Sequence, residues 1–342
     1  MGLSQFNREE ACRCAAILRF RGFPMQKIIL GAVVICALTF LLLPTPIQAH
    51  GLEGDRFFPP TPLTDDPFAV DELSLPEIQY NPAGASNEVD ITGSLSKEIF
   101  PKFALSIADT YVNLNPKGGH AQDGWSPLSF NAKYQLWEIP EHEFILSVGS
   151  DFTLGGTGSK GIQASAYPYQ SYTTYTPNLY LGKGFNELPD SLKFLRPLAI
   201  TTVTGYDLYA NAAASNALEW SGSLQYSLPY LQEHVEDVGL PRPFRDMIPV
   251  VEFQMTTPTN KDATPTTGTI DPGVLWEGKY CQISGEVSIP INSRSGPAVG
   301  GLIQVQIFID DLFPKIFGHP IFGNDDDTNP TDTQAVEGTS EK

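Results

Sequence analysis

Short segments that alternate apolar and polar residues fill the chain from Val89 to Phe308, about eleven in all. The stretch 218–228 shows the pattern best: its even positions carry apolar side chains, except for Gly222, and its odd positions carry Glu, Ser or Gln. A period of two places successive side chains on opposite faces of a β-strand. The sequence therefore predicts an all-β protein whose strands each have one apolar face.

The predicted strands are long. Most span ten to twelve residues, close to the ~9–11 residues that cross a bilayer at a tilt, whereas soluble β-proteins favour about five or six. They lie at 88–97, 103–113, 128–137, 143–154, 175–184, 198–208, 217–228, 248–257, 267–276, 280–289 and 299–309. Strand length therefore favours a membrane protein.

Connections between these strands alternate between tight and long. The tight ones are 98–102, 138–142 and 277–279, and the long ones, rich in Gly, Ser, Asn, Thr and Pro, are 114–127, 155–174, 209–216, 258–266 and 290–298. Outer-membrane barrels have short periplasmic turns and longer external loops. Because a sheet in lipid must leave no backbone edge unpaired, we expect an antiparallel transmembrane β-barrel.

An odd number of strands cannot close antiparallel with both ends on the periplasmic side. The chain must therefore hold one more strand before Asn87, and Leu73, Leu75, Ile78 and Tyr80 supply the best material for it. The predicted barrel has about 12 strands.

Two connections on the predicted periplasmic side are longer and carry helical patterns. In 228–247, Leu231, Val235 and Val238 share a face between Pro229 and Gly239, which suits a short helix that ends near the glycine. Residues 188–195 predict a second, shorter helix. Both would lie across the inner mouth of the barrel or at its rim.

The chain divides into four predicted parts. Residues 1–49 are a leader with a signal peptide over the apolar run 28–43, and Met25 is the expected true start. An extended segment (50–72), the barrel (73–313) and a tail (314–342), disordered from about 323, follow.

The net charge is −18 for the whole chain. An acidic protein of this kind is a poor partner for nucleic acid.

The polar strand faces indicate which side points inward. They hold small uncharged residues with isolated charges, which suits a water-lined lumen better than the surface of a soluble sheet. The predicted lumen-facing charges are Asp90, Lys133, Glu219, Glu252 and Glu286. Two interpretations stay open: the carboxylates favour cations or neutral solutes, or they pair with Lys133, Lys183 or neighbours inside a packed barrel.

No catalytic, metal or cofactor site is predicted. The histidines His50, His120, His142, His234 and His319 stand outside the strands or at turns, without a partner that the sequence justifies. The glycine-rich 155–161 lacks the following helix of a phosphate loop and predicts an external loop. His50 and Asp325–Asp327 are weak metal ligands, better explained by signal cleavage and an acidic tail.

Five stretches carry a resemblance to a known family: 54–76, 141–158, 175–199, 219–231 and 266–276. They resemble an uncharacterised family of Gram-negative outer-membrane barrel proteins described as transporters, similar in layout to the barrels associated with the meta-pathway of phenol degradation. The resemblance implies a location and a fold, and it brings no catalytic motif. Such barrels often end on an aromatic strand residue. Here either Phe308 or Phe313 holds an internal form of that assembly signal, or the tail marks a distinct subgroup.

We therefore expect a porin-like channel or transporter for small solutes, hydrophobic ones among them, in the cell outer membrane. Its expected partners are outer-membrane lipid and the barrel assembly machinery. Two alternatives remain: a structural or adhesion barrel without transport, and a secreted soluble β-protein that binds a ligand.

Overall fold

The computed structural model describes residues 52–82, 86–165, 172–210, 214–260 and 265–323, which all belong to one compact unit. The predicted leader and signal peptide, His50 and the tail from residue 324 on lie outside the described residues. No helix among the described residues is long and apolar enough to cross a membrane.

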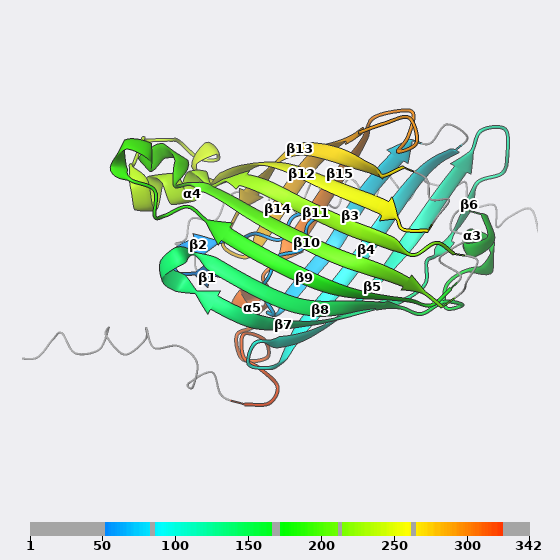
Figure 1. Cartoon of the computed structure of the whole chain (residues 1–342), viewed down its shortest axis with the longest axis horizontal. Coiled ribbons are helices and arrows are strands. Elements are labelled where there is room, and N and C mark those ends of the chain that lie inside the picture. The colour runs from blue at the N-terminus through cyan, green and yellow to red at the C-terminus, as the bar shows by residue number, and fades with distance from the viewer. Residues whose placement is uncertain (1–51, 83–85, 166–171, 211–213, 261–264, 324–342) are drawn as a thin grey trace, which may run out of the picture. The chain divides into compact units, whose positions relative to one another are not determined.

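Twelve long strands form a closed antiparallel β-barrel (Figure 1). Each pairs with its two neighbours around the barrel, and the pairing of β4 with β5 closes the ring. The strands are β3 (Glu72–Pro82), β4 (Ser86–Phe100), β5 (Phe103–Pro116), β7 (Ser129–Ile139), β8 (Phe144–Thr153), β9 (Thr174–Gly184), β10 (Leu198–Tyr209), β11 (Ala217–Tyr226), β12 (Met247–Pro258), β13 (Thr267–Glu277), β14 (Cys281–Pro290) and β15 (Gly300–Ile307).

The strand required by parity is β3, which confirms that prediction. It lies between β15 and β4, and Ile78 stands opposite Ile303 on one side and Ile91 on the other. Without β3, the first and last strands of the alternating pattern would not meet. The closed ring therefore depends on a segment whose alternation is interrupted by Pro76 and by a register shift between Ser74 and Glu77.

The barrel has an apolar exterior. Each of the twelve long strands carries at least one large apolar side chain that is more than a third exposed: Tyr80, Leu95, Leu105, Phe130, Phe152, Leu179, Leu208, Leu224, Val251, Ile270, Val287 and Ile303 are one per strand. Soluble monomers rarely expose a continuous apolar surface of this kind. The apolar strand faces therefore point outward, toward a surrounding apolar phase.

The two ends of the barrel differ, and we name them by their connections. The turn end has tight turns after β4, β7 and β13, and the loop end has the long connections. Two other connections at the turn end contain short helices: η2 (Asp190–Leu195) between β9 and β10, and α4 (Leu228–Tyr230), η3 (Leu231–Val235) and η4 (Phe244–Asp246) between β11 and β12. The predicted helix is therefore two short turns that end at Val235, before Gly239, because Glu236 already adopts extended backbone.

Several short elements were not predicted, among them four that lie between or after the long strands. A strand, β6 (Gln122–Trp125), extends the sheet at the loop-end half of β5, and a helix, α3 (Lys160–Ser165), follows the glycine-rich loop, where we expected no helix. The others are η1 (Pro140–His142) and α5 (Ile309–Leu312). A helix of six residues has too few turns for its own periodicity to show in the sequence.

The apolar exterior predicts a depth-dependent cost for charge. Val251 is 43% exposed in the middle of β12, and Val299 is 52% exposed beside the loop-end start of β15. We expect Val251→Arg to lower the free energy of unfolding in lipid vesicles by about 2–4 kcal/mol and Val299→Arg by about 0–1 kcal/mol. Chemical unfolding followed by tryptophan fluorescence measures both, and equal costs would contradict an apolar belt centred on Val251.

Candidate functional site

A segment of the chain's own N-terminal part lies inside the barrel. Residues 52–57 form a two-stranded sheet, β1 (Leu52–Glu53) and β2 (Arg56–Phe57), and residues 58–71 continue without helix or strand (Figure 1). Prolines at four positions between 58 and 68 remove backbone donors, which prevents this stretch from joining a sheet. We name residues 54–71 the lumen segment.

Side chains on opposite walls hold the lumen segment. Glu252 on β12 accepts hydrogen bonds from the Thr61 hydroxyl at 2.5 Å and from the Leu63 backbone N–H at 3.1 Å. The Gln282 amide on β14 donates to the Pro60 carbonyl at 2.7 Å. The bonds to Leu63 and Pro60 satisfy backbone groups of an irregular segment that would otherwise be buried without partners.

The opposite wall completes the path of the segment. Five wall side chains bond consecutive parts of the segment there. Lys133 bonds Asp66, Ser147 bonds Pro67 and Gln135 bonds Ala69. Ser96 then bonds Val70, and Lys97 bonds Asp71. The lumen segment therefore contacts β12, β14, β7, β8 and β4, and it crosses the lumen at its turn-end half.

Arg56 anchors the start of the segment at the turn end. Its guanidinium is buried, lies 3.2 Å from a Glu143 carboxylate oxygen, and donates to the carbonyls of Pro197 at 3.1 Å and Arg196 at 2.5 Å. It also lies over the Tyr230 ring at 3.6 Å, and the Tyr230 hydroxyl donates to Glu143 at 2.8 Å. Both charges of this pair are therefore buried, and each is hydrogen-bonded to more than one partner.

Apolar side chains of the segment cover an apolar patch on the inner wall. Phe58 and Phe68 pack with Ile145 and Ala199, and Phe57 packs with Ile248, Val250 and Leu275. A lumen filled only with water would be expected to have a polar lining. The wall is therefore complementary to the segment that it holds.

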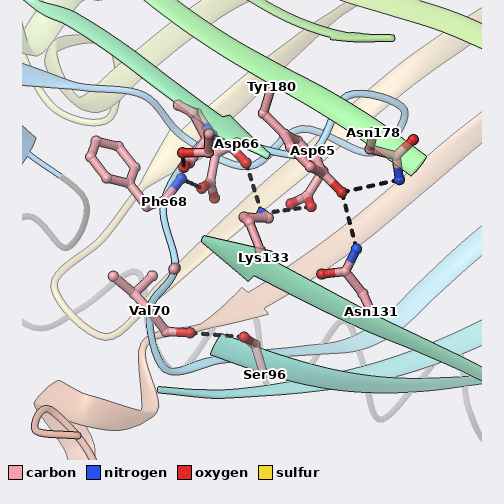
Figure 2. A network of polar contacts seen from close by, with 12 residues as sticks. Asp65, Asp66, Phe68, Val70, Ser96, Asn131, Lys133, Asn178 and Tyr180 are labelled. Atoms are coloured by element: carbon pink, nitrogen blue, oxygen red, sulfur yellow. Dashed lines mark hydrogen bonds and ion pairs between the residues drawn. The ribbon is translucent and has the colours of Figure 1, made fainter. Parts of the chain in front are cut away.

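Lys133 connects the lumen segment to a polar network on the wall (Figure 2). Its ammonium lies 2.7 Å from an Asp65 oxygen, donates to the Asp66 carbonyl at 2.8 Å, and lies over the Tyr180 ring. The Tyr180 hydroxyl accepts from the amides of Asn131 at 3.0 Å and Asn178 at 3.3 Å (Figure 2). The same two amides donate to Asp151, at 2.7 and 2.5 Å. The network fixes the orientation of every side chain in it.

A cavity of about 610 Å³ lies between the lumen segment and the loop end of the wall. We name it the vestibule. The lumen segment contributes Leu63, Asp65 and Phe68 to its lining, and Thr153 and Thr174, the loop-end residues of β8 and β9, also line it. A second cavity of about 340 Å³, lined by Glu88 and Asp90 among others, shares Thr110 and Ser126 with it.

The structure separates the five charges that the sequence singled out. Lys133 and Glu252 bond the lumen segment, Glu219 lines the vestibule and Asp90 lines the second cavity. Glu286 is buried on β14, and its carboxyl lies near that of Glu252. The lysines proposed as their partners are engaged elsewhere: Lys133 with Asp65, and Lys183 with Glu187.

Sequence reasoning missed Asp151 and Asp207, which line the vestibule with Glu219. Asp207 accepts from the Thr176 hydroxyl at 2.6 Å. Both aspartates lie within predicted strands. Their odd or even position in the apolar–polar alternation could have placed them on the inner face, but Gly149 and Gly205 interrupt the alternation beside them. No group of three or more His, Cys, Asp or Glu side chains in the described part of the chain is placed to hold a metal ion.

Comparison with known proteins found no matching family model and no matching curated protein. Similar solved structures are outer-membrane barrels. KdgM porin is 14% identical, with 70% of this chain and 98% of that chain covered and a TM-score of 0.39. NanC porin is 10% identical, with 69% of this chain and 98% of that chain covered and a TM-score of 0.43. The COG4313 outer membrane channel from Pseudomonas putida F1 is 10% identical, with 73% and 99% covered and a TM-score of 0.49. Because these TM-scores are below 0.5, the closed barrel rests on the strand pairing itself.

Glu53, just before the lumen segment, predicts a pH dependence. Burial and the nearby Glu138 carboxylate raise the pKa of Glu53 from 4.5 to about 7. Its contribution to stability is therefore complete below about pH 4.5 and is lost as the pH rises through 7. We expect Glu53→Gln to raise the free energy of unfolding above pH 8 by at most about 3 kcal/mol, with little effect at pH 4.

Urea unfolding in detergent micelles at both pH values measures this difference. Asp190→Asn is the control, because the Asp190 side chain is 93% exposed at the same end of the barrel. An equal effect of Glu53→Gln at pH 4 and pH 8 would contradict the assigned cause.

Proposed function

We propose that this protein is an outer-membrane channel or transporter for small solutes whose own lumen segment restricts passage. The observation that carries the proposal is a closed barrel with an apolar exterior and a polar vestibule that ends at the lumen segment. Solutes would enter the vestibule at the loop end and pass the turn end when the segment moves.

Several features support an outer-membrane location. A closed antiparallel barrel leaves no unpaired edge in lipid, and large apolar side chains cover the outside of every long strand. The resemblance to the outer-membrane barrel family described as transporters, which is similar in layout to the barrels associated with the meta-pathway of phenol degradation, agrees with this location. The same apolar exterior disfavours a secreted soluble β-protein, since such a surface would aggregate in water. Outer-membrane lipid and the barrel assembly machinery are the partners that this location requires.

A barrel without transport is the runner-up. The observation that favours it is the number of strands to which the lumen segment is bonded, because so many bonds would hold the segment immobile in the lumen. The two functions differ in one measurable property. A channel gated by the segment conducts more when the segment is loosened, whereas a structural barrel with a rigid interior does not.

Arg56→Ala tests this difference. The substitution leaves Glu143 buried without its cationic partner, a change that typically costs about 3–5 kcal/mol, and should free the start of the lumen segment. We expect single-channel recordings in planar bilayers to show rare, short openings for the wild type and at least a several-fold higher open probability for the variant.

Arg242→Ala is the matched control, because Arg242 lies at the same end of the barrel, half-exposed and paired only with Asp246 among the described residues. Heat-modifiable gel migration confirms that each variant is folded. Unchanged conductance of a folded Arg56→Ala barrel would contradict gating by the lumen segment and favour the structural barrel.

A further inference from the structure

We infer that the vestibule is a binding site for a small solute that carries a protonated amine. The inference rests on the proposed function, because it names the class of solute that the channel admits. The site lies between Asp65 of the lumen segment and the barrel wall, and Figure 2 shows the side chains of Asp65, Asn131, Asn178 and Tyr180, which belong to its lining.

Charge is the first argument. The vestibule lining contains five carboxylates and a single basic side chain, Lys133. The carboxylates are Asp65, Glu72, Asp151, Asp207 and Glu219. Lys133 is almost fully buried and already bonds Asp65 and the Asp66 carbonyl. An entering solute therefore meets a surface of excess negative charge, in a cavity whose protein walls reduce screening by water.

The arrangement of the carboxylates is the second argument. Asp151, Asp207 and Glu219 stand near the loop-end ends of β8, β10 and β11, and the Thr176 hydroxyl of β9 bonds Asp207 between them. The Glu219 and Asp207 carboxyls lie side by side. Neighbouring carboxylates repel each other unless a proton or a cation lies between them. An ammonium group, with three donors, matches such a pair.

Unused hydrogen-bonding capacity at the floor is the third, independent argument. Tyr180 is only 2% exposed, and its hydroxyl accepts two amide hydrogens while its own proton has no acceptor among the described residues. The Asn131 amide oxygen also has no hydrogen-bond partner in the described structure. Buried polar groups usually have partners, and those that lack one mark a place where a ligand or water completes the bonding. A solute with hydroxyl groups beside its amine would supply both an acceptor and a donor.

The volume of the vestibule sets the upper limit on the size of the solute. A cavity of about 610 Å³ lies within the range of small-molecule sites, about 300–1,000 Å³, and is large enough for a disaccharide. Serine and threonine are the most frequent of the remaining lining residues and include Thr110, Ser129, Thr153 and Thr174. The site therefore fits a polar, hydroxylated amine better than an apolar molecule.

Three disaccharides of similar size separate the contribution of the solute's charge from that of its hydroxyl groups. Diglucosamine is cationic at pH 7, its N,N′-diacetyl form is neutral, and digalacturonate is anionic. Calorimetry with the purified full chain in detergent micelles at low salt should show diglucosamine binding at least tenfold more tightly than the diacetyl form, and digalacturonate not binding. The preference should shrink at high salt, since screening weakens partly exposed charges.

The variant Asp207→Asn/Glu219→Gln keeps the shape of both side chains and abolishes the negative charge of the pair. We expect it to weaken diglucosamine binding at least tenfold. Glu141→Gln, an exposed carboxylate at the turn end, is the control and should bind as the wild type does. Equal binding of the cationic and neutral disaccharides, or unchanged affinity in the folded double variant, would overturn the inference.

Failure of the proposed function gives a different result. If diglucosamine binds as expected but neither the wild type nor Arg56→Ala conducts in planar bilayers, the binding site stands and transport fails. If both conduct but the three disaccharides bind alike or not at all, transport stands and the amine site is wrong.

Discussion

Pairing of every strand edge is the constraint on which this structure depends. The β3–β4 and β3–β15 pairs join the two ends of the alternating region, so that every long strand of the wall pairs with a strand on each side. Only a closed wall can carry apolar residues on the outside of all its strands. Closure therefore decides the direction of each side chain: once the apolar face points outward, the polar face can only line the lumen.

A lumen enclosed by twelve strands is wider than side chains alone can fill, since about eight strands already bring opposite walls into contact. The chain fills the turn-end half with its own residues and leaves the vestibule in the loop-end half. The wall residues of the two halves differ in the same way. Ile145 and Leu275 cover phenylalanines of the lumen segment, whereas Asp151 and Asp207 face a cavity. The position of the segment therefore determines which wall residues a solute can reach.

Alternation and strand parity predicted the barrel because both are properties of single strands and their connections. Even β3 could be placed, since antiparallel closure requires an even number of strands. The path of the lumen segment could not be predicted, because residues 58–71 have no period and their partners, such as Glu252 and Lys133, are distant in sequence. The helix after β11 was placed correctly but ends earlier than predicted, because extended backbone at Glu236 stops it before Gly239.

The same reasoning explains why the candidate site was only partly foreseen. The sequence shows that Lys133 and Glu252 lie on polar faces, but not that the lumen segment occupies them. A charge that bonds the segment helps to hold it in the lumen, whereas a charge such as Glu219 lines the vestibule, where we infer that a solute binds. Because Asp65 belongs to the segment and also lines the vestibule, a solute bound there would contact the element that we propose closes the channel. Binding in the vestibule and movement of the segment are therefore expected to be coupled through the Asp65–Lys133 pair.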